Sequence, residues 1–365
     1  MSAWIVAARR TAVVPRGGAF ARLSIEDLGA PVVRAVLADS GVEAVDELVV
    51  SNALGAGGNP ARRVALAAGL EVAGLTIDRQ CAGGLDALRL AAALVESGAE
   101  AVLAGGVESY SRRPLRLATD PDGGAPVQYD EAPFTPWPDR DPGMAEAAAR
   151  LADRLGMSRA AQEAFAVVSH RKALAAVPAG IVELAGVARD AFPRRLTPAV
   201  AARAKGVAGS VTAATMAVAA DGAAFCLVVG DKLAARFSRA MRIVAGATLG
   251  SDPLEPGLSA IAPMRAVLDR AGIGVGDLGR VELMEAFAVQ AMASIAALDL
   301  DPVRVNPEGG GLAFGHPVGA SGAMLAVRLF HGLRGGHGLA GIAGAGGVGA
   351  ALLVQARDST EPGRI

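Results

Sequence analysis

The sequence predicts an α/β protein made of two copies of one unit, with an irregular excursion between them. Three observations support this fold class. Apolar runs that resemble strands alternate with segments of helical periodicity, short segments of the first half recur in the second half, and the stretch between the copies differs in composition. Such alternation is typical of a largely buried sheet covered by helices.

The first unit alternates strands and helices from its beginning. Trp4 to Ala8 predicts a strand, and Ser24 to Ser40 predicts a helix with a serine cap and two acidic residues in its first turn. Leu48 to Ser51 and Val102 to Gly106 predict further strands, and Gly74 to Asp78 is a short extended segment. This order predicts a layered α/β unit.

An internal repeat predicts that the second unit copies the first. Arg34 to Leu37 recurs 231 positions later as Arg265 to Leu268. The further matches, in the same order, are Ala82-Gly83-Gly84 with Ala320-Ser321-Gly322 at 238 positions, and Ala104 to Val107 with Ala345 to Val348 at 241 positions. Separations that grow only slightly indicate two copies of one α/β unit with small insertions.

The repeat and the change in composition set the expected boundaries. The first half is expected at residues 1–235 with the excursion at about 112–206, the second half at 236–357, and a tail at 358–365. Arg112 to Asp141 is rich in proline, glycine and aspartate and predicts an irregular surface segment. Met144 to Leu155 and Ser158 to Ala176 predict helices within the excursion.

Composition excludes several classes of protein. Of 365 residues, 52% are hydrophobic and 19% are charged, and 35 basic residues nearly balance 36 acidic ones, so we expect no nucleic-acid partner. The apolar run before Arg9 is too short for a secretory signal, and we expect a cytoplasmic protein. Gly338 to Ala356 has no charged residue, but its many glycines predict two buried strands and no membrane span. Two distant cysteines predict no metal site.

Cys81 is the first candidate for chemistry. It follows the extended segment and precedes a helix whose apolar face runs from Leu85 to Val95. The amino end of a helix favours the thiolate, which is the nucleophilic form of cysteine, so we expect a lowered thiol pKa. A buried structural cysteine is the alternative, because a free cysteine packs as a small hydrophobic side chain.

Several ordered blocks around this cysteine resemble the thiolase family. They are Val49 to Gly55, Gly58 to Arg62, Ala104 to Ser111, and Asn306 to Gly322 with its glycine-histidine-proline segment. The resemblance runs over nearly the whole chain. It implies the thiolase fold, in which two repeated α/β halves form a layered α-β-α-β-α core with a loop-domain excursion, and it implies that Cys81 is the catalytic nucleophile.

The resemblance also implies the roles of other site residues. His316 would activate Cys81 and polarise the thioester oxygen, and the backbone amides of Cys81 and Ala345 would form an oxyanion hole. Three residues are expected to line the substrate pocket: Ala217, Ala286 and Phe287. Gly344 to Gly349 also fits the dinucleotide pattern G-x-G-x-x-G, but a strand-like run follows it where that motif requires a helix.

Two positions depart from the family pattern. Met284 stands where the family has the asparagine of its Asn-Glu-Ala-Phe motif, and Ala343 stands where it has a second cysteine. In the family that cysteine removes a proton from the attacking carbon, and the asparagine holds a water that stabilises the second thioester oxygen. Methionine and alanine can do neither.

The implied function is a thiolase-like acyltransferase acting on acyl-CoA through an acyl-cysteine, similar to acetyl-CoA acetyltransferase or 3-ketoacyl-CoA thiolase. The resemblance implies no permanently bound cofactor, a homodimer or homotetramer, and a place in fatty acid metabolism. The alternatives are acyl transfer, hydrolysis or decarboxylative condensation without an α-carbon base, or a catalytically weak acyl-CoA-binding or partner subunit. The basic segment Arg189 to Lys205 is either a contact for coenzyme A phosphates or a solvated face.

Overall fold

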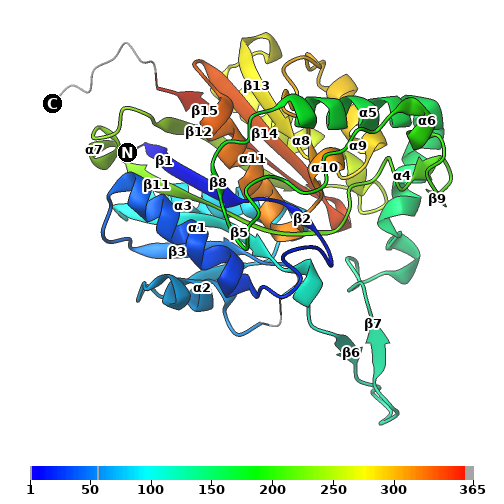
Figure 1. Ribbon diagram of the computed structural model, residues 1–365, viewed down its shortest axis with the longest axis horizontal. Helices are drawn as coiled ribbons and strands as arrows, with labels where there is room; N and C mark the ends of the chain where they lie inside the picture. Colours follow the sequence, from blue (N-terminus) through cyan, green and yellow to red (C-terminus); the bar gives the residue numbers. More distant parts are fainter. Residues whose placement is uncertain (1, 56, 358–365) are drawn as a thin grey trace.

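One mixed sheet runs through the whole molecule (Figure 1). The computed structural model describes residues 2–55 and 57–357, so the tail expected at 358–365 lies outside the described residues. The eleven-stranded sheet has the order β13-β14-β15-β12-β1-β11-β5-β3-β4, and β2 and β8 pair beside this path. Its strands are β1 (Ala3–Thr11), β2 (Val14–Pro15), β3 (Glu47–Ser51), β4 (Leu75–Ile77), β5 (Ala101–Glu108), β8 (Ile181–Val182), β11 (Ala220–Gly230), β12 (Met241–Gly250), β13 (Leu278–Leu283), β14 (His337–Gly344) and β15 (Val348–Ala356).

The sheet repeats one strand pattern on the two sides of the β1–β12 junction. In the first half β3 is parallel to β5, β5 is antiparallel to β11, and β11 is antiparallel to β1. In the second half β13 is parallel to β14, β14 is antiparallel to β15, and β15 is antiparallel to β12. The strands β1 and β12 join the halves through the antiparallel pairs Trp4↔Arg242 and Ile5↔Met241. The repeat in the sequence therefore corresponds to a repeat in topology.

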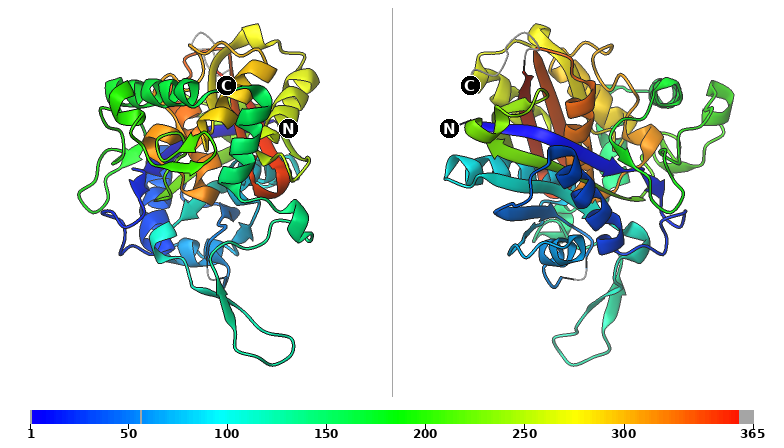
Figure 2. Two further views of the ribbon diagram at one scale, coloured as in Figure 1. Left: turned by 90° about the vertical axis from the view of Figure 1, so that its right-hand side faces the viewer. Right: turned by 60° about the vertical axis from the view of Figure 1, so that its left-hand side comes forward.

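Helices cover and separate the two halves of the sheet (Figure 2). One buried cluster packs α1 (Ile25–Ser40) and α2 (Pro60–Ala68) on the first half, and another packs α8 (Ile261–Ala271) on the second. A third cluster joins α3 (Gly83–Glu96) and α11 (Val318–Gly332) to strands of both halves. These three cores confirm the expected layered architecture and bring the amino ends of α3 and α11 together.

Gly41 and Gly272, which are separated by the same 231 positions as the first repeated segment, end equivalent helices. Ser24 caps α1 with a capping box, since its hydroxyl accepts from the Asp27 amide at 3.2 Å and its own amide donates to the Asp27 carboxylate at 2.9 Å. Gly41 ends α1 with φ 62°, and Gly272 ends α8 with φ 65°. This left-handed conformation favours glycine, so the repeat preserves the stop signal as well as the apolar face.

The excursion leaves the body of the molecule as a hairpin and returns as helices. Figure 2 shows β6 (Arg116–Ala118) and β7 (Val127–Tyr129) projecting from the body. The expected helices are present as α4 (Met144–Leu155) and α5 (Arg159–Ala175).

The remaining elements, from all parts of the chain, are α6 (Pro198–Ala201), β9 (Gly206–Ala208), β10 (Val211–Thr212), α7 (Asp231–Ala234), α9 (Ala288–Ala297), α10 (Gly311–Phe314) and the 3₁₀ turns η1 (Gln80–Ala82), η2 (Tyr110–Arg112), η3 (Pro138–Arg140), η4 (Pro256–Leu258), η5 (Val275–Asp277) and η6 (Ala345–Gly347).

The charge-free segment near the carboxyl end forms two neighbouring strands. As predicted, it supplies β14 and β15, which pair antiparallel in the sheet. Among residues 2–55 and 57–357, no helix has the length and apolar character needed to cross a membrane.

Candidate active site

Cys81 lies at the amino end of α3, in the 3₁₀ turn η1. The turn begins at Gln80, whose φ of 49° is left-handed and whose amide donates to the Asp78 carboxylate at 2.8 Å. The partly exposed Cys81 thiol lines a cavity of about 310 Å³. The turn therefore holds the thiol between the helix and an accessible space.

His316 reaches this thiol from the other half of the molecule. Its Nε2 lies 3.0 Å from Cys81 Sγ, although the two residues are 235 positions apart. Its Nδ1 lies 2.6 Å from Ser321 Oγ, in the first turns of α11. The His316 amide donates to the Val218 carbonyl at 2.8 Å, which fixes the loop. Ser321 lies inside the block Asn306 to Gly322, but no role was predicted for it from the sequence.

Two backbone amides act on the thiol. The N–H groups of Cys81 and Ala345 both lower the pKa of Cys81, because they favour the thiolate. Ala345 lies in η6, between β14 and β15, where Gly346 and Gly347 have φ of 71° and 74°. A Cβ on Gly347 would lie 2.6 Å from the Ser251 carbonyl oxygen, so this turn requires glycine there. The glycine motif thus forms a tight turn that presents an amide to Cys81.

The pKa of the Cys81 thiol differs from the lowered value expected at a helix start. Burial raises the pKa of the Cys81 thiol to about 12 and outweighs the two amides, which lower it. Burial also lowers the pKa of His316 to about 4. The expectation of a lowered thiol pKa at Cys81 is therefore wrong for the resting protein. Both shifts favour the uncharged forms, which are a neutral thiol beside a neutral imidazole.

The residues expected to line the substrate pocket meet at this cavity. Ala217, Ala286 and Phe287 all border it, together with Cys81, His316 and Ala345. The Ala217 amide donates to the Ala286 carbonyl at 2.9 Å, which joins two of these walls. Most of the remaining lining is apolar, as in a typical small-molecule site.

Other lining residues were not identified from the sequence. Arg113 and Arg116, from the excursion, border the cavity, as do Tyr110, Phe134 and Met144. The Arg113 guanidinium stacks 4.5 Å from the centre of the Tyr110 ring. The only sequence signal was the mixture of aromatic and basic residues in a segment expected to be irregular.

Ala343 and Met284, the two positions at which the resemblance implies a departure from the family pattern, face different spaces. Ala343, near the end of β14, lines the Cys81 cavity. Met284, just after β13, is buried and borders a separate cavity of about 30 Å³, together with Gly311 and Ser321. A thiol at position 343 would therefore lie in the Cys81 cavity, whereas the Met284 side chain packs behind the histidine loop.

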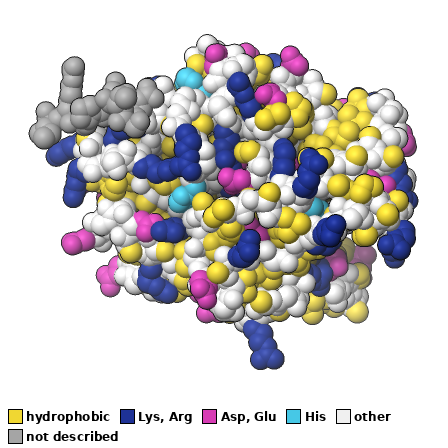
Figure 3. Space-filling model, turned by 45° about the horizontal axis from the view of Figure 1, so that its top comes forward, with side chains coloured by type: hydrophobic (Ala, Val, Ile, Leu, Met, Phe, Trp, Pro, Cys, Tyr) yellow, Lys and Arg dark blue, Asp and Glu magenta, His cyan; other side chains and the backbone are white. Residues whose placement is uncertain are grey.

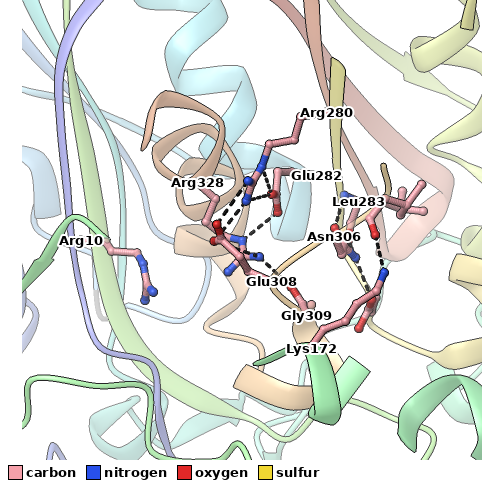
Figure 4. A network of polar contacts seen from close by, with 12 residues as sticks. Arg10, Lys172, Arg280, Glu282, Leu283, Asn306, Glu308, Gly309 and Arg328 are labelled. Atoms are coloured by element: carbon pink, nitrogen blue, oxygen red, sulfur yellow. Dashed lines mark hydrogen bonds and ion pairs between the residues drawn. The ribbon is translucent and has the colours of Figure 1, made fainter. Parts of the chain in front are cut away.

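The basic segment from Arg189 to Lys205 does not reach the Cys81 cavity. Arg189 borders another cleft, of about 260 Å³, with Arg10 and Arg328. Figure 4 shows Arg328 and Arg280 directed toward Glu282 and Glu308, so these two guanidinium groups already have carboxylate partners. Figure 3 shows arginine and lysine side chains dispersed among acidic and hydrophobic ones on one face of the molecule.

Comparisons with known proteins agree with this fold. The family model of the thiolase N-terminal domain matches residues 3–232, and that of the thiolase C-terminal domain matches residues 238–356. The chain is 37% identical to the Bacillus subtilis protein YhfS over 347 residues, which cover 91% of this chain and 92% of that protein. It is 36% identical to an acetyl-CoA acetyltransferase of Pseudomonas aeruginosa over 362 residues, covering 90% and 91% of the two chains.

A solved structure resembles almost the entire molecule. The crystal structure of the Bacillus anthracis acetyl-CoA acetyltransferase superposes with a TM-score of 0.88 at 31% identity, and the match covers 98% of this chain and 99% of the other. Fold and sequence together define an enzyme of the acyltransferase class. The chain belongs to the thiolase family.

Proposed function

We propose that this protein takes an acyl group from a coenzyme A thioester onto Cys81 and passes it to an acceptor. The observation that carries the proposal is the 3.0 Å contact between His316 Nε2 and Cys81 Sγ at the wall of an open cavity. A nucleophile within hydrogen-bonding reach of a base, and a base oriented by a third group, are the signature of covalent catalysis. Ser321 is the orienting group here.

The first half-reaction follows from the neutral resting pair. His316 Nε2 accepts the thiol proton while the sulfur attacks the carbonyl carbon of the thioester. Nδ1 must then carry the other ring proton, and this N–H group donates a hydrogen bond to Ser321 Oγ. The amides of Cys81 and Ala345 both stabilise negative charge at the thiol, and both residues border the cavity, which supports a role as donors to the developing oxyanion. The tetrahedral intermediate collapses, the bond to the coenzyme A sulfur breaks, and His316 returns the proton to that sulfur.

The second half-reaction has fewer identifiable parts. The methyl group of Ala343 lines the cavity where the family has a cysteine that removes the α-proton. This observation favours transfer to a nucleophilic acceptor, hydrolysis, or decarboxylative condensation, because none of these requires an α-carbon base. The acetyl-CoA acetyltransferase reaction remains the family alternative, and a weakly active acyl-CoA-binding subunit is the other.

Intact-mass measurement after mixing with a panel of acyl-CoA esters tests the proposal. We expect the protein to gain the mass of one acyl group, to release free coenzyme A, and to lose both effects in Cys81→Ser. The acyl chain that loads fastest identifies the substrate class. Failure of every ester to form an adduct on Cys81 overturns the proposal and leaves the binding-subunit alternative.

We also propose a homodimer or homotetramer, on the strength of the family resemblance. Light scattering at micromolar concentration is the direct measurement, and a monomeric mass contradicts this part of the proposal.

A further inference from the structure

A buried carboxylate lies at the end of β5, beside the starts of the two central helices. Glu108 is 1% exposed and accepts four hydrogen bonds. Its Oε1 accepts from Asn52 Nδ2 at 2.8 Å and from the Leu54 amide at 3.0 Å. Its Oε2 accepts from the amides of Ala53 at 3.0 Å and Gly319 at 3.1 Å. All four donors are uncharged, so they orient the carboxylate without neutralising it.

This carboxylate lies where α3 and α11 meet. A Cβ added to Gly319, in the first turn of α11, would lie 3.0 Å from Glu108 Oε2 and 2.9 Å from Ser51 Oγ. A Cβ added to Gly83, at the start of α3, would overlap the same Ser51 hydroxyl. Gly83 follows the nucleophile by two positions, and Gly319 follows the catalytic histidine by three. Both helix starts therefore pack against one polar centre, and the positive ends of two helix dipoles converge there.

The hydrogen-bond pattern selects the ionised form of Glu108. An ionised carboxylate only accepts hydrogen bonds, whereas a protonated one would present an O–H group to an N–H donor and lose a contact. Burial opposes ionisation and raises the pKa of Glu108 to about 7, although the amides of Ala53, Gly319 and Leu54 lower it. The charge of Glu108 also contributes to the raised pKa of Cys81. The carboxylate therefore acts on the proton at the nucleophile.

Other charged groups surround this centre on two sides. On the cavity side lie Cys81, His316, Asp78, and Arg116, whose Nη2 donates to the Ala53 carbonyl at 3.2 Å. On the opposite side, Glu108 borders a cleft of about 160 Å³ that also contains Arg63, Arg112, Arg113 and Glu26. Asp221 lies on the neighbouring strand β11, and its carboxylate accepts a hydrogen bond from the Ser111 amide. Of these charged groups, Asp78 opposes the ionised form of Glu108.

We propose that Glu108 is a positioning residue whose charge retains the single proton shared by Cys81 and His316. The inference rests on the proposed function, in which those two residues form the catalytic pair. The negative charge of Glu108 raises the proton affinity of the Cys81 thiolate. The pair then exists as thiol with imidazole or as thiolate with imidazolium, and it resists losing the proton to solvent. When the thiolate becomes an acyl-cysteine, the imidazolium keeps the proton and can donate it to the departing coenzyme A sulfur.

The pH dependence of thiol alkylation tests this role without any acyl-CoA. Cys81 is labelled with iodoacetamide from about pH 6 to about pH 10, and labelling is followed by intact mass, since only the thiolate reacts. We expect Glu108→Gln to shift the alkaline rise to lower pH by about one unit, which makes labelling about tenfold faster on the rising limb. A purely structural role of Glu108 would change the rate without moving the profile along the pH axis.

Glu285→Gln is the matched control. Glu285 is also buried. It accepts hydrogen bonds from Ser169 Oγ at 2.6 Å and from Asn306 Nδ2 at 2.7 Å, and Asn306 begins the segment up to Gly322 that contains the histidine loop. Glu285 does not border the Cys81 cavity. We expect its removal to loosen the loop without moving the alkylation profile. An equal shift in both variants, or no shift in Glu108→Gln, overturns the proposal.

A second pair of variants guards against a misfolded glutamine variant. Glu108→Asp and Glu108→Asn have the same side-chain length and differ in charge. We expect the asparagine variant to show the shift relative to the aspartate variant, and coincident profiles overturn the inference. The outcome is independent of the proposed function, because a protein that shows the shift but forms no acyl adduct keeps the inference and loses the acyl-transfer proposal.

Discussion

Cys81 and Cys226 occupy two regions of the same central core but have different neighbours. Burial raises the thiol pKa of both. Cys226 lies in the middle of β11 with no exposed surface, and its partners across the sheet are Ala8 and Ala104. Cys81 lies at a helix start, partly exposed to a cavity, with an imidazole 3.0 Å away. The resting pKa therefore does not distinguish the proposed nucleophile, whereas a proton acceptor and an open approach do.

The largest expected effect concerns the thiol itself. Cys81→Ala should abolish the acyl adduct and the faster of two alkylation events, because it removes the only thiol that borders the cavity. Cys226→Ala is the matched control and should leave both signals intact. Intact mass with peptide mapping distinguishes the two sites. Equal, slow alkylation of both cysteines in the unmodified protein would contradict the assignment of Cys81 as nucleophile.

The next effect concerns the proton acceptor. His316→Asn should slow acyl loading by about 10² to 10⁴, the range for loss of a placed general base. His331→Asn is a suitable control, because the His331 ring contacts the Ala8 carbonyl at 2.8 Å and does not border the Cys81 cavity. Stopped-flow release of free coenzyme A measures the rate. If the two variants behave alike, the Cys81–His316 contact is not the source of reactivity.

A gain of function examines the second half-reaction. Ala343→Cys combined with Met284→Asn should raise cleavage of 3-oxoacyl-CoA by about 10² or more, because it supplies the missing α-carbon base. Ala343→Cys alone separates the two contributions, since only position 343 borders the cavity. Ordinary enzyme rates in the unmodified protein would mean that another residue removes the α-proton. The assay follows acetyl-CoA and free coenzyme A by chromatography.

The smallest effect concerns the group that orients the imidazole. Ser321→Ala removes the 2.6 Å contact with His316 Nδ1. One hydrogen bond contributes about 1 kcal/mol, which corresponds to about fivefold in the loading rate. Ser321→Thr keeps the hydroxyl and should recover most of the rate. Full activity in the alanine variant would show that the loop backbone alone orients the ring.

The sequence predicted the features that depend on local pattern or ordered motifs. The repeated segments correspond to matching strand orders, and the cap at Ser24 lies where residue type placed it. The expected closeness of Cys81 and His316 came from family blocks rather than spacing. The raised pKa of Cys81 escaped prediction because burial depends on walls contributed by distant segments. The four contacts of Glu108 escaped it too, since one donor lies 211 positions away.

The joining of the two halves at β1 and β12 completes the site around Cys81, and this has a consequence for biosynthesis. Cys81 belongs to the part of the chain that leaves the ribosome first, while His316 and the Ala345 amide belong to the part that leaves last. During synthesis the thiol has no proton acceptor beside it, and the wall formed by the second half is missing. Competence for acyl transfer therefore arises only when the two halves dock, so covalent labelling of Cys81 by an acyl thioester would also serve as a readout of completed folding.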